Sequence, residues 1–245
     1  MLPLTYLAVI LLSLLSGLTS LIGVFLALFF KGSDRKIAVG IGFSVGIMLI
    51  LSFFELIPEA LAAIPLFSVL GALGFGFLLV LTLDFLFPHI RYFEEKGLLH
   101  PHLKAAYLVA FGLILHDFPE GFAMASSYIL TPSLGLLVSA SIAIHNIPEE
   151  FAMAVPLVLS GKRGLLLKLS LLSILAEPLG AVIGLIGVSF ASALGPFLMA
   201  FAAGAMIYVS VDELFPMARR MGKTPLFILG AGLAVLVYFG LTLVF

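Results

Sequence analysis

Two six-residue motifs, "HDFPEG" starting at His116 and "HNIPEE" starting at His145, repeat a histidine, a proline and a glutamate at one spacing. His116 and Glu120 are four residues apart, as are His145 and Glu149, so on a helix each pair lies on one face. Imidazole combined with carboxylate suits Zn²⁺, and also Fe²⁺, Mn²⁺, Co²⁺ or Cd²⁺. Two facing helices are therefore predicted to offer two imidazoles and two carboxylates to one metal ion.

Two further polar residues are predicted to join this cluster. Asn146 is the only asparagine of a chain that has no glutamine, and it stands beside His145. Glu177 lies deep in an apolar segment, where a charged side chain costs about 2.5–3.5 kcal/mol and needs a partner. We therefore expect both residues near the metal ion.

The prolines of the two motifs have a predicted role in the backbone. Pro119 and Pro148 lack an amide hydrogen and clash with the carbonyl groups of Leu115 and Ile144, four residues earlier. A break of this kind at membrane depth is tolerated where it lines a polar cavity. A kink that frees these two carbonyl groups is expected.

The elements that carry these residues are long and apolar. The 245-residue chain is 62% hydrophobic and 10% charged, and it has no cysteine, which excludes disulfides and thiolate metal sites. Apolar runs long enough to cross a bilayer as helices recur along its whole length. We expect an all-α polytopic membrane protein with eight transmembrane helices and one transporter domain, residues 1–245. The expected segments are 3–30, 37–60, 66–88, 105–127, 134–159, 165–189, 196–217 and 224–245.

The basic residues predict the orientation in the membrane. All twelve lie in or beside the loops after the first, third, fifth and seventh apolar segments. The positive-inside rule makes these loops cytoplasmic and both termini extracytoplasmic. The longest cytoplasmic loop, about 89–104, contains His89, His100 and His102, to which no role is assigned.

Related sequences in antiparallel helices predict an inverted repeat. "ELIPEA" at 55–60 and "DELFPMA" at 212–218 share Glu-Leu-x-Pro. Such repeats are common in secondary transporters, whose ion site lies near the midplane. His116 and His145 are each about 11 residues into their segments, or roughly 16 Å deep. Further acidic residues of the apolar segments are assigned to the ion pathway: Glu55, Glu150, Asp212 and Glu213.

With these features the sequence resembles the ZIP (ZRT/IRT-like) metal transporters, in particular their compact prokaryotic branch. The resemblance implies eight helices, both ends outside, and a binuclear metal centre. It assigns a primary transport site to His116, Glu120, His145 and Glu149. It assigns an adjacent second site to Asp117, Asn146 and Glu177, with Glu120 and Glu149 bridging the two.

The chain departs from the family pattern at two positions. Asp117 stands where the family has asparagine, which adds a carboxylate to the second site. Glu150 stands where glycine often follows Pro-Glu, so the helix packing expected there is not assured. The mechanism that the resemblance implies is alternating access.

The predicted function is transport of divalent transition metal ions, zinc foremost, into the cytoplasm, and not catalysis. Iron or manganese as the main substrate is one alternative. An intramembrane metalloenzyme is another, although its His-Glu-x-x-His pattern is absent, and a proton-coupled carrier for another solute is a third. We expect a multi-pass prokaryotic plasma-membrane protein with lipid and metal ion as partners, no organic cofactor and no nucleic acid. The oligomeric state is left open, with a homodimer as one option.

Overall fold

The computed structural model describes residues 2–29, 33–86 and 101–245, and within these ranges every regular element is a helix. Six helices are uninterrupted: α1 (Leu2–Phe29), α4 (Leu66–Leu86), α6 (Pro101–Leu130), α7 (Pro132–Leu159), α8 (Arg163–Phe190) and α11 (Thr224–Thr242). Because lipid cannot hydrogen-bond to the backbone, a spanning segment has to satisfy its own peptide groups, as a helix does. Among the described residues, seven helices are long and apolar enough to cross a membrane.

Two longer rods each contain a short π-helix. One rod runs from α2 (Asp34–Ile50) through η1 (Leu51–Leu56) into α3 (Ile57–Ala63). The other runs from α9 (Leu194–Tyr208) through η2 (Val209–Leu214) into α10 (Phe215–Arg220). The sequence predicted plain continuous segments here, at 37–60 and 196–217. The π-helices are a structural finding that hydrophobicity does not report.

The turn between α7 and α8 shows how the chain reverses direction. Gly161 has φ of +68°, a left-handed conformation that glycine adopts without steric penalty. The Gly161 amide donates to the Val158 carbonyl and the Lys162 amide to the Leu157 carbonyl, at 3.1 and 2.9 Å. These two bonds form a Schellman motif, which ends α7 and sends α8 back antiparallel to it.

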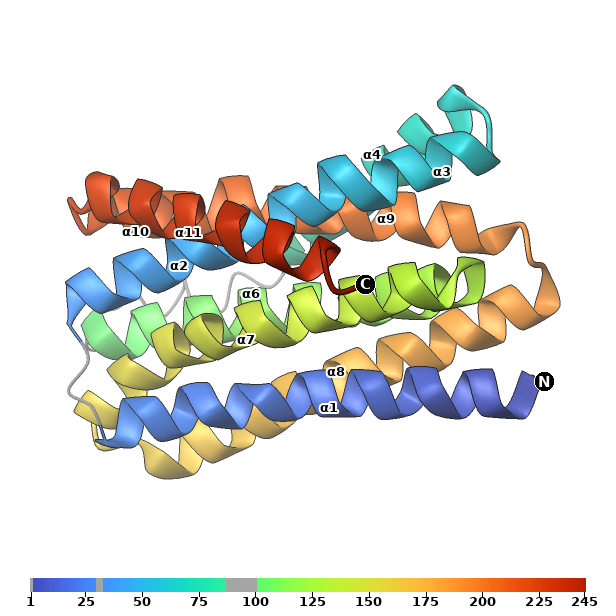
Figure 1. Ribbon diagram of the computed structural model, residues 1–245. Helices are drawn as coiled ribbons and strands as arrows, with labels where there is room; N and C mark the ends of the chain where they lie inside the picture. The colour runs from blue at the N-terminus through green and yellow to red at the C-terminus, as the bar shows by residue number, and fades with distance from the viewer. Residues whose placement is uncertain (1, 30–32, 87–100) are drawn as a thin grey trace.

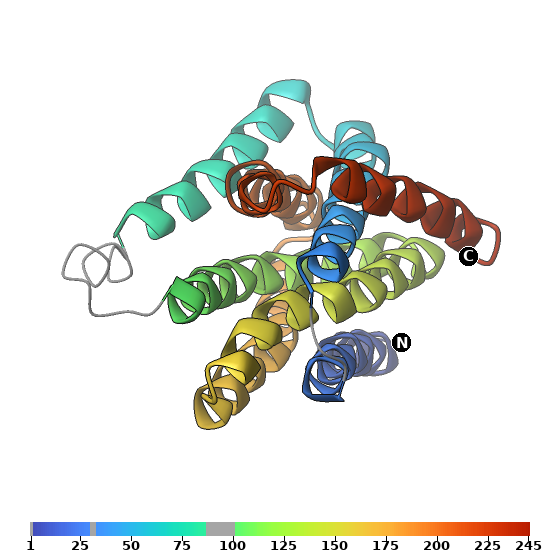
Figure 2. The ribbon, with the colours of Figure 1, turned by 90° about the vertical axis from the view of Figure 1, so that its left-hand side faces the viewer.

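Four helices form a central bundle. Going around it, α1 packs against α7, α7 against α6, α6 against α8, and α8 against α1 (Figure 2). On one side α2 packs against α7 and α9 against α6, while α11 covers α2 and α4 covers α9 (Figure 1). In their most apolar stretches, 67% of the residues of α7 and of α9 are buried, against 33% in α1, 17% in α4 and 22% in α11. The helices α2, α11, α9 and α4 thus cover one side of the central bundle, while α1 is largely exposed.

Glycines bring the outer helices to backbone contact. A Cβ added at Gly76 would lie 2.0 Å from the Phe201 carbonyl oxygen, and one at Gly204 would lie 2.0 Å from that of Leu73. Small residues allow such close approach of helices in membranes. The pair α2 and α11 is joined in the same way, at Gly42 and Gly230.

The described helices overlap the expected apolar segments, with differences of a few residues at several boundaries. The loop expected at about 89–104 ends earlier, because α6 already begins at Pro101. His89 and His100 lie outside the described residues, and so does the side chain of His102.

We predict that Gly76→Ala lowers the stability of the folded protein by about 1–3 kcal/mol, the usual effect of overpacking. Gly74→Ala is the matched control, because a Cβ at Gly74 would meet nothing within 4 Å. Melting temperatures of the purified variants in one detergent measure the difference. Equal melting temperatures for the two variants would contradict the backbone contact between α4 and α9.

Candidate metal centre

The two motif histidines lie at the centres of their helices. His116 stands midway along the 30-residue α6, and His145 midway along the 28-residue α7. Both helices continue through their prolines, Pro119 and Pro148, without an interruption of helical structure. The neighbouring α6 and α7 therefore present matching polar segments to each other inside the central bundle.

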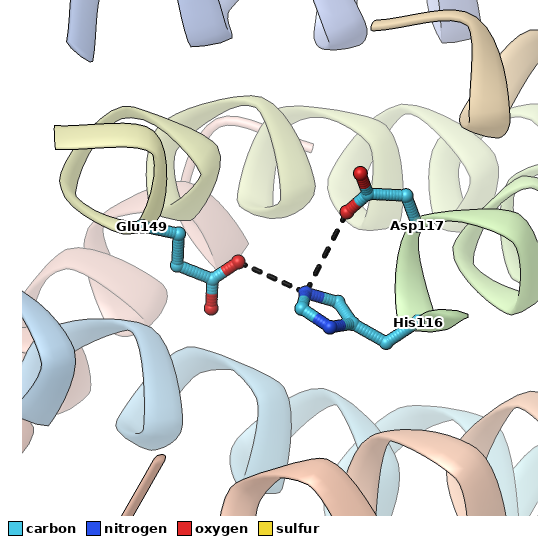
Figure 3. Close-up of side chains that lie close together, drawn as sticks. All are labelled: His116, Asp117 and Glu149. Carbon is cyan, nitrogen blue, oxygen red and sulfur yellow. Dashed lines mark hydrogen bonds and ion pairs between the residues drawn. The ribbon is translucent and has the colours of Figure 1, made fainter. Parts of the chain in front are cut away.

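The histidines and glutamates pair across the two helices. His116 Nε2 lies 3.0 Å from Glu149 Oε2 (Figure 3), and His145 Nε2 lies 3.0 Å from Glu120 Oε1. All four residues are buried, none more than 2% exposed. The predicted face of each helix is thus turned toward the other helix, and each imidazole contacts the carboxylate of the opposite motif.

Asp117 extends this cluster on the side of α8. Its Oδ1 atom lies 3.5 Å from His116 Nε2, and its Oδ2 atom accepts a hydrogen bond of 2.6 Å from the Ser173 hydroxyl. Ligand atoms of His116, Asp117 and Glu149 all lie within 4.8 Å of one another. Asp117, which is expected in the second site, thus lies next to His116 and Glu149 of the expected primary site.

Asn146 and Glu177 are also brought together. The Asn146 amide nitrogen donates to Glu177 Oε1 at 2.5 Å, and it lies 3.4 Å from the Ser16 hydroxyl of α1. The pairing of Asn146 with Ser16 matches that of Asp117 with Ser173 on the other side of the bundle. All seven predicted ligands are buried between α1, α6, α7 and α8.

Several oxygens of this cluster have no hydrogen-bond partner among the described residues. They are Glu120 Oε2, Glu149 Oε1, Glu177 Oε2 and Asn146 Oδ1. A buried acceptor without a partner costs about 1–3 kcal/mol, and more when it is charged. Within the described cluster the ion pairs involve only histidines, with no lysine or arginine. A bound divalent cation would give these oxygens the missing partner.

Hydrogen bonds within α7 and from the neighbouring helices α1 and α2 fix the orientation of the α7 motif. His145 Nδ1 donates to the Ser141 carbonyl at 3.0 Å, which leaves Nε2 as the ring atom directed at Glu120. The Ser44 hydroxyl of α2 donates to the His145 carbonyl at 3.0 Å. The Thr19 hydroxyl of α1 donates at 2.6 Å to the carbonyl of Ala143. Such contacts around a ligand hold its ring in place.

Known proteins of similar sequence span nearly the whole chain. The family described as ZIP Zinc transporter matches residues 94–244. "Zinc transporter ZupT" of Corynebacterium aurimucosum is 38% identical, over 91% of this chain and 92% of that protein. The chain belongs to the ZIP family. Proteins that are also named Zinc transporter ZupT, from Chlorobium luteolum and Shigella dysenteriae, are each 36% identical. These matches cover 94% and 86% of this chain and 95% and 87% of the relatives, respectively. Together with its apolar helices, this membership makes the chain a multi-pass membrane protein.

Glu150, one of the two departures from the ZIP pattern, occupies the place that Gly121 has in α6. A Cβ at Gly121 would lie 2.2 Å from the Glu177 carbonyl oxygen, so this glycine is needed for contact between α6 and α8. The partner helices also supply a glycine on each side, since a Cβ at Gly180 of α8 would lie 2.0 Å from the Phe118 carbonyl oxygen and one at Gly23 of α1 would lie 2.3 Å from that of Ile147. Close packing is therefore kept at both places. Glu150 is 1% exposed, and neither of its oxygens accepts a hydrogen bond from the described residues.

The predicted pathway acids of the outer helices interact with tyrosines. Glu55 of η1 accepts a hydrogen bond from the Tyr238 hydroxyl of α11. The Tyr208 hydroxyl lies 3.1 Å from Asp212 Oδ2 and 3.2 Å from Asp84 Oδ2. The side chain of Glu213 is outside the described part of the protein. Glu55 and Asp212 lie on the outer helices, and their described hydrogen bonds do not reach the central cluster.

The hydroxyl groups that support the site were not predicted from the sequence. Contacts with the motif residues are made by Ser16, Ser44 and Ser173, but serine is common in apolar helices and does not by itself indicate a role in a site. One signal was present in α1, where the buried serines 13, 16 and 20 follow helical spacing and form a polar stripe. That stripe faces the central bundle.

We predict that Thr19→Val, which keeps the shape of the side chain, lowers the stability by about 0.6 kcal/mol and at most about 1.7 kcal/mol, as for hydrogen bonds between membrane helices. The control is Thr82→Val, because the Thr82 hydroxyl bonds only to Leu78 of its own helix. Thermal unfolding in detergent compares the two. A larger loss for Thr82→Val would show that the bond from α1 to α7 contributes little.

Proposed function

We propose that this protein transports divalent transition metal ions, with zinc as its main substrate, across the plasma membrane into the cytoplasm. The observation that carries the proposal is the buried cluster in which crossed His–Glu pairs and unpartnered oxygens meet without a lysine or arginine. A proton or metal ion is the remaining source of positive charge for such a cluster. The ZIP relatives, named as zinc transporters, support the choice of ion.

The proposed centre is binuclear. The primary transport site consists of His116, Glu120, His145 and Glu149, and its crossed pairs match the nitrogen and oxygen ligands of zinc. The second site consists of Asp117, Asn146 and Glu177, bridged to the first by the two glutamates. The unpartnered oxygens on both glutamates, on Asn146 and on Glu177 support this division.

The proposed topology has eight membrane crossings, both termini outside, and a single domain. The starts of α2 and α8 and the turn from α10 to α11 lie together at the left-hand end of Figure 1. Basic residues gather at these places, namely Arg35, Lys36, Lys162, Arg163 and Arg219. The positive-inside rule assigns this end to the cytoplasm. The 30-residue α6 would be the eighth crossing, and the mid-helix histidines would lie near the midplane.

Alternating access between two inverted repeats is the proposed mechanism. The packing supports a repeat, because the contact of α1 with α7 has a counterpart in that of α6 with α8, and the contact of α2 with α11 has one in α4 with α9. In such transporters one group of helices moves against another around a fixed site. The proposed ion pathway beyond the centre uses Glu55, Glu150, Asp212 and Glu213.

Two alternatives are kept distinct from this proposal. Iron or manganese as the main substrate fits the same ligands, since imidazole and carboxylate also bind these ions. An intramembrane metalloenzyme is disfavoured because the ZIP relatives are named as transporters. Measurements of metal entry into liposomes distinguish zinc uptake from iron or manganese uptake and from a metalloenzyme that transports no ion.

We expect the purified protein in liposomes to admit external Zn²⁺ faster than protein-free liposomes do, as followed by a trapped metal-sensitive dye. His116→Ala and His145→Ala each remove a proposed ligand and are expected to lower the initial rate at least tenfold. Ser139→Ala serves as the control, because the buried Ser139 hydroxyl makes no hydrogen bond to the described residues.

Zinc entry no faster than in empty liposomes, or unchanged in both histidine variants, would overturn the transport proposal. Faster entry of Fe²⁺ or Mn²⁺ than of Zn²⁺ at equal concentration would favour the alternative substrates. The initial rate of each variant is divided by the protein content of its liposome preparation, which corrects for variants that reconstitute in lower amounts.

We also expect two zinc ions per wild-type chain and one per Glu177→Gln chain at saturating zinc. Glutamine keeps the size of the side chain and an oxygen that can accept the Asn146 hydrogen bond, but it removes the negative charge of the second site. Metal content after equilibrium dialysis measures the ratio. Two ions in the variant would show that Glu177 is not essential to a second site, and one ion in the wild type would contradict the binuclear centre.

A further inference from the structure

An apolar groove opens on the surface between α1 and the pair formed by α2 and α11. Two adjoining pockets of about 460 and 350 Å³ form it, and both are lined by Lys36, Gly40 and Pro148. These volumes fall in the range of pockets that hold small molecules, about 300–1,000 Å³. Leu26 of α1 and Leu233 of α11 line opposite sides. The groove therefore reaches from the surface to α7, the helix of the second motif.

The charges of the groove lie at one end only. Arg35 and Lys36 are exposed in the first turn of α2, and all other lining residues are apolar. Asp34 precedes them in the same turn and is also exposed, so this turn has a net charge of about +1. An apolar lining does not suit a path for metal ions. A second copy docking on the groove by a two-fold axis would bring these like charges close together.

We propose that this groove binds one anionic phospholipid. The phosphate lies against Arg35 and Lys36, and an acyl chain follows α2 past Gly40 and Phe43. Basic pockets between membrane helices bind anionic lipid headgroups in this way, and long basic side chains reach the headgroup level from an apolar surface. This binding site goes beyond the transport of metal ions and does not require the protein to be active.

The bound lipid contacts α7 at a functionally important turn. Gly40 leaves room at the floor of the groove, since a Cβ there would already lie 3.0 Å from the Pro148 Cβ atom. Pro148 immediately precedes Glu149, whose carboxylate contacts His116 across the central bundle. A lipid in the groove therefore touches the same helical turn that carries the proposed metal ligand.

The absence of tryptophan from the chain allows a direct test with one introduced fluorophore. Phe43→Trp places it in the groove, and Phe75→Trp places it on the surface of α4, where Phe75 is 62% exposed. Each protein is reconstituted in phosphatidylcholine with a small fraction of dibrominated phosphatidylglycerol or dibrominated phosphatidylcholine. Bromine quenches tryptophan only at short range, so quenching reports which lipid stays beside the fluorophore.

We expect brominated phosphatidylglycerol to quench Phe43→Trp at a concentration at least threefold lower than brominated phosphatidylcholine does. Adding Arg35→Ala and Lys36→Ala should abolish this preference, whereas Lys162→Ala with Arg163→Ala, exposed basic residues outside the groove, should keep it. Phe75→Trp should show no preference.

Equal quenching of Phe43→Trp by the two lipids would overturn the proposal. The proposal would also be overturned if the preference for phosphatidylglycerol survived the loss of Arg35 and Lys36. The same holds if the loss of Lys162 and Arg163 reduced this preference equally, because general surface charge would then explain it. Quenching that depends on the protein-to-lipid ratio and not on the lipid headgroup would instead identify a second copy of the chain in the groove. None of these results depends on metal transport, so failure here leaves the transport proposal intact.

Discussion

Burial of several carboxyl groups without a basic side chain is the constraint on which the centre of this protein depends. Asp117, Glu120, Glu149 and Glu177 lie among apolar helices, and their described ion pairs are with histidines alone. Attraction between imidazole and carboxylate holds α6 against α7, yet it leaves oxygens without partners. Carboxylate oxygens without partners suit a cluster that binds a cation, and hydrogen bonds from the surrounding hydroxyl groups hold its residues in position.

The sequence predicted the helices and the polar side chains that gather at the centre, because both follow from local sequence patterns. Apolar runs mark the helices, and the spacing of His116 and Glu120 marks one helix face. The crossed partners could not be predicted, since they depend on how α6 and α7 rotate about their axes and slide past each other. Nor could the roles of Ser44 and Thr19, because nothing local in α1 or α2 indicates that their hydroxyl groups reach the α7 backbone.

The two sides of the centre are alike in packing and unlike in charge. Ser173 bonds to Asp117 on one side, and Ser16 lies beside Asn146 on the other. On each side a glycine of the partner helix allows close contact, Gly180 of α8 against α6 and Gly23 of α1 against α7. The α6 side has a further close-contact glycine, Gly121, at the position where α7 carries the buried Glu150. The α7 side thus keeps the glycine of its partner helix and holds an acid in place of the second one.

The similarity of the two π-helices, η1 and η2, favours an origin of both from one duplicated segment. η1 and η2 have the same length, each contains serine at its second position and is followed by proline two residues after its end, and each is closed by an amide that donates to that serine's carbonyl. A π-helix corresponds to a local departure from regular α-helical bonding and is rarely retained without use. One ancestral segment that already contained the irregularity, later copied, accounts for both by a single event. The irregularity would then be older than the division of the protein into two halves.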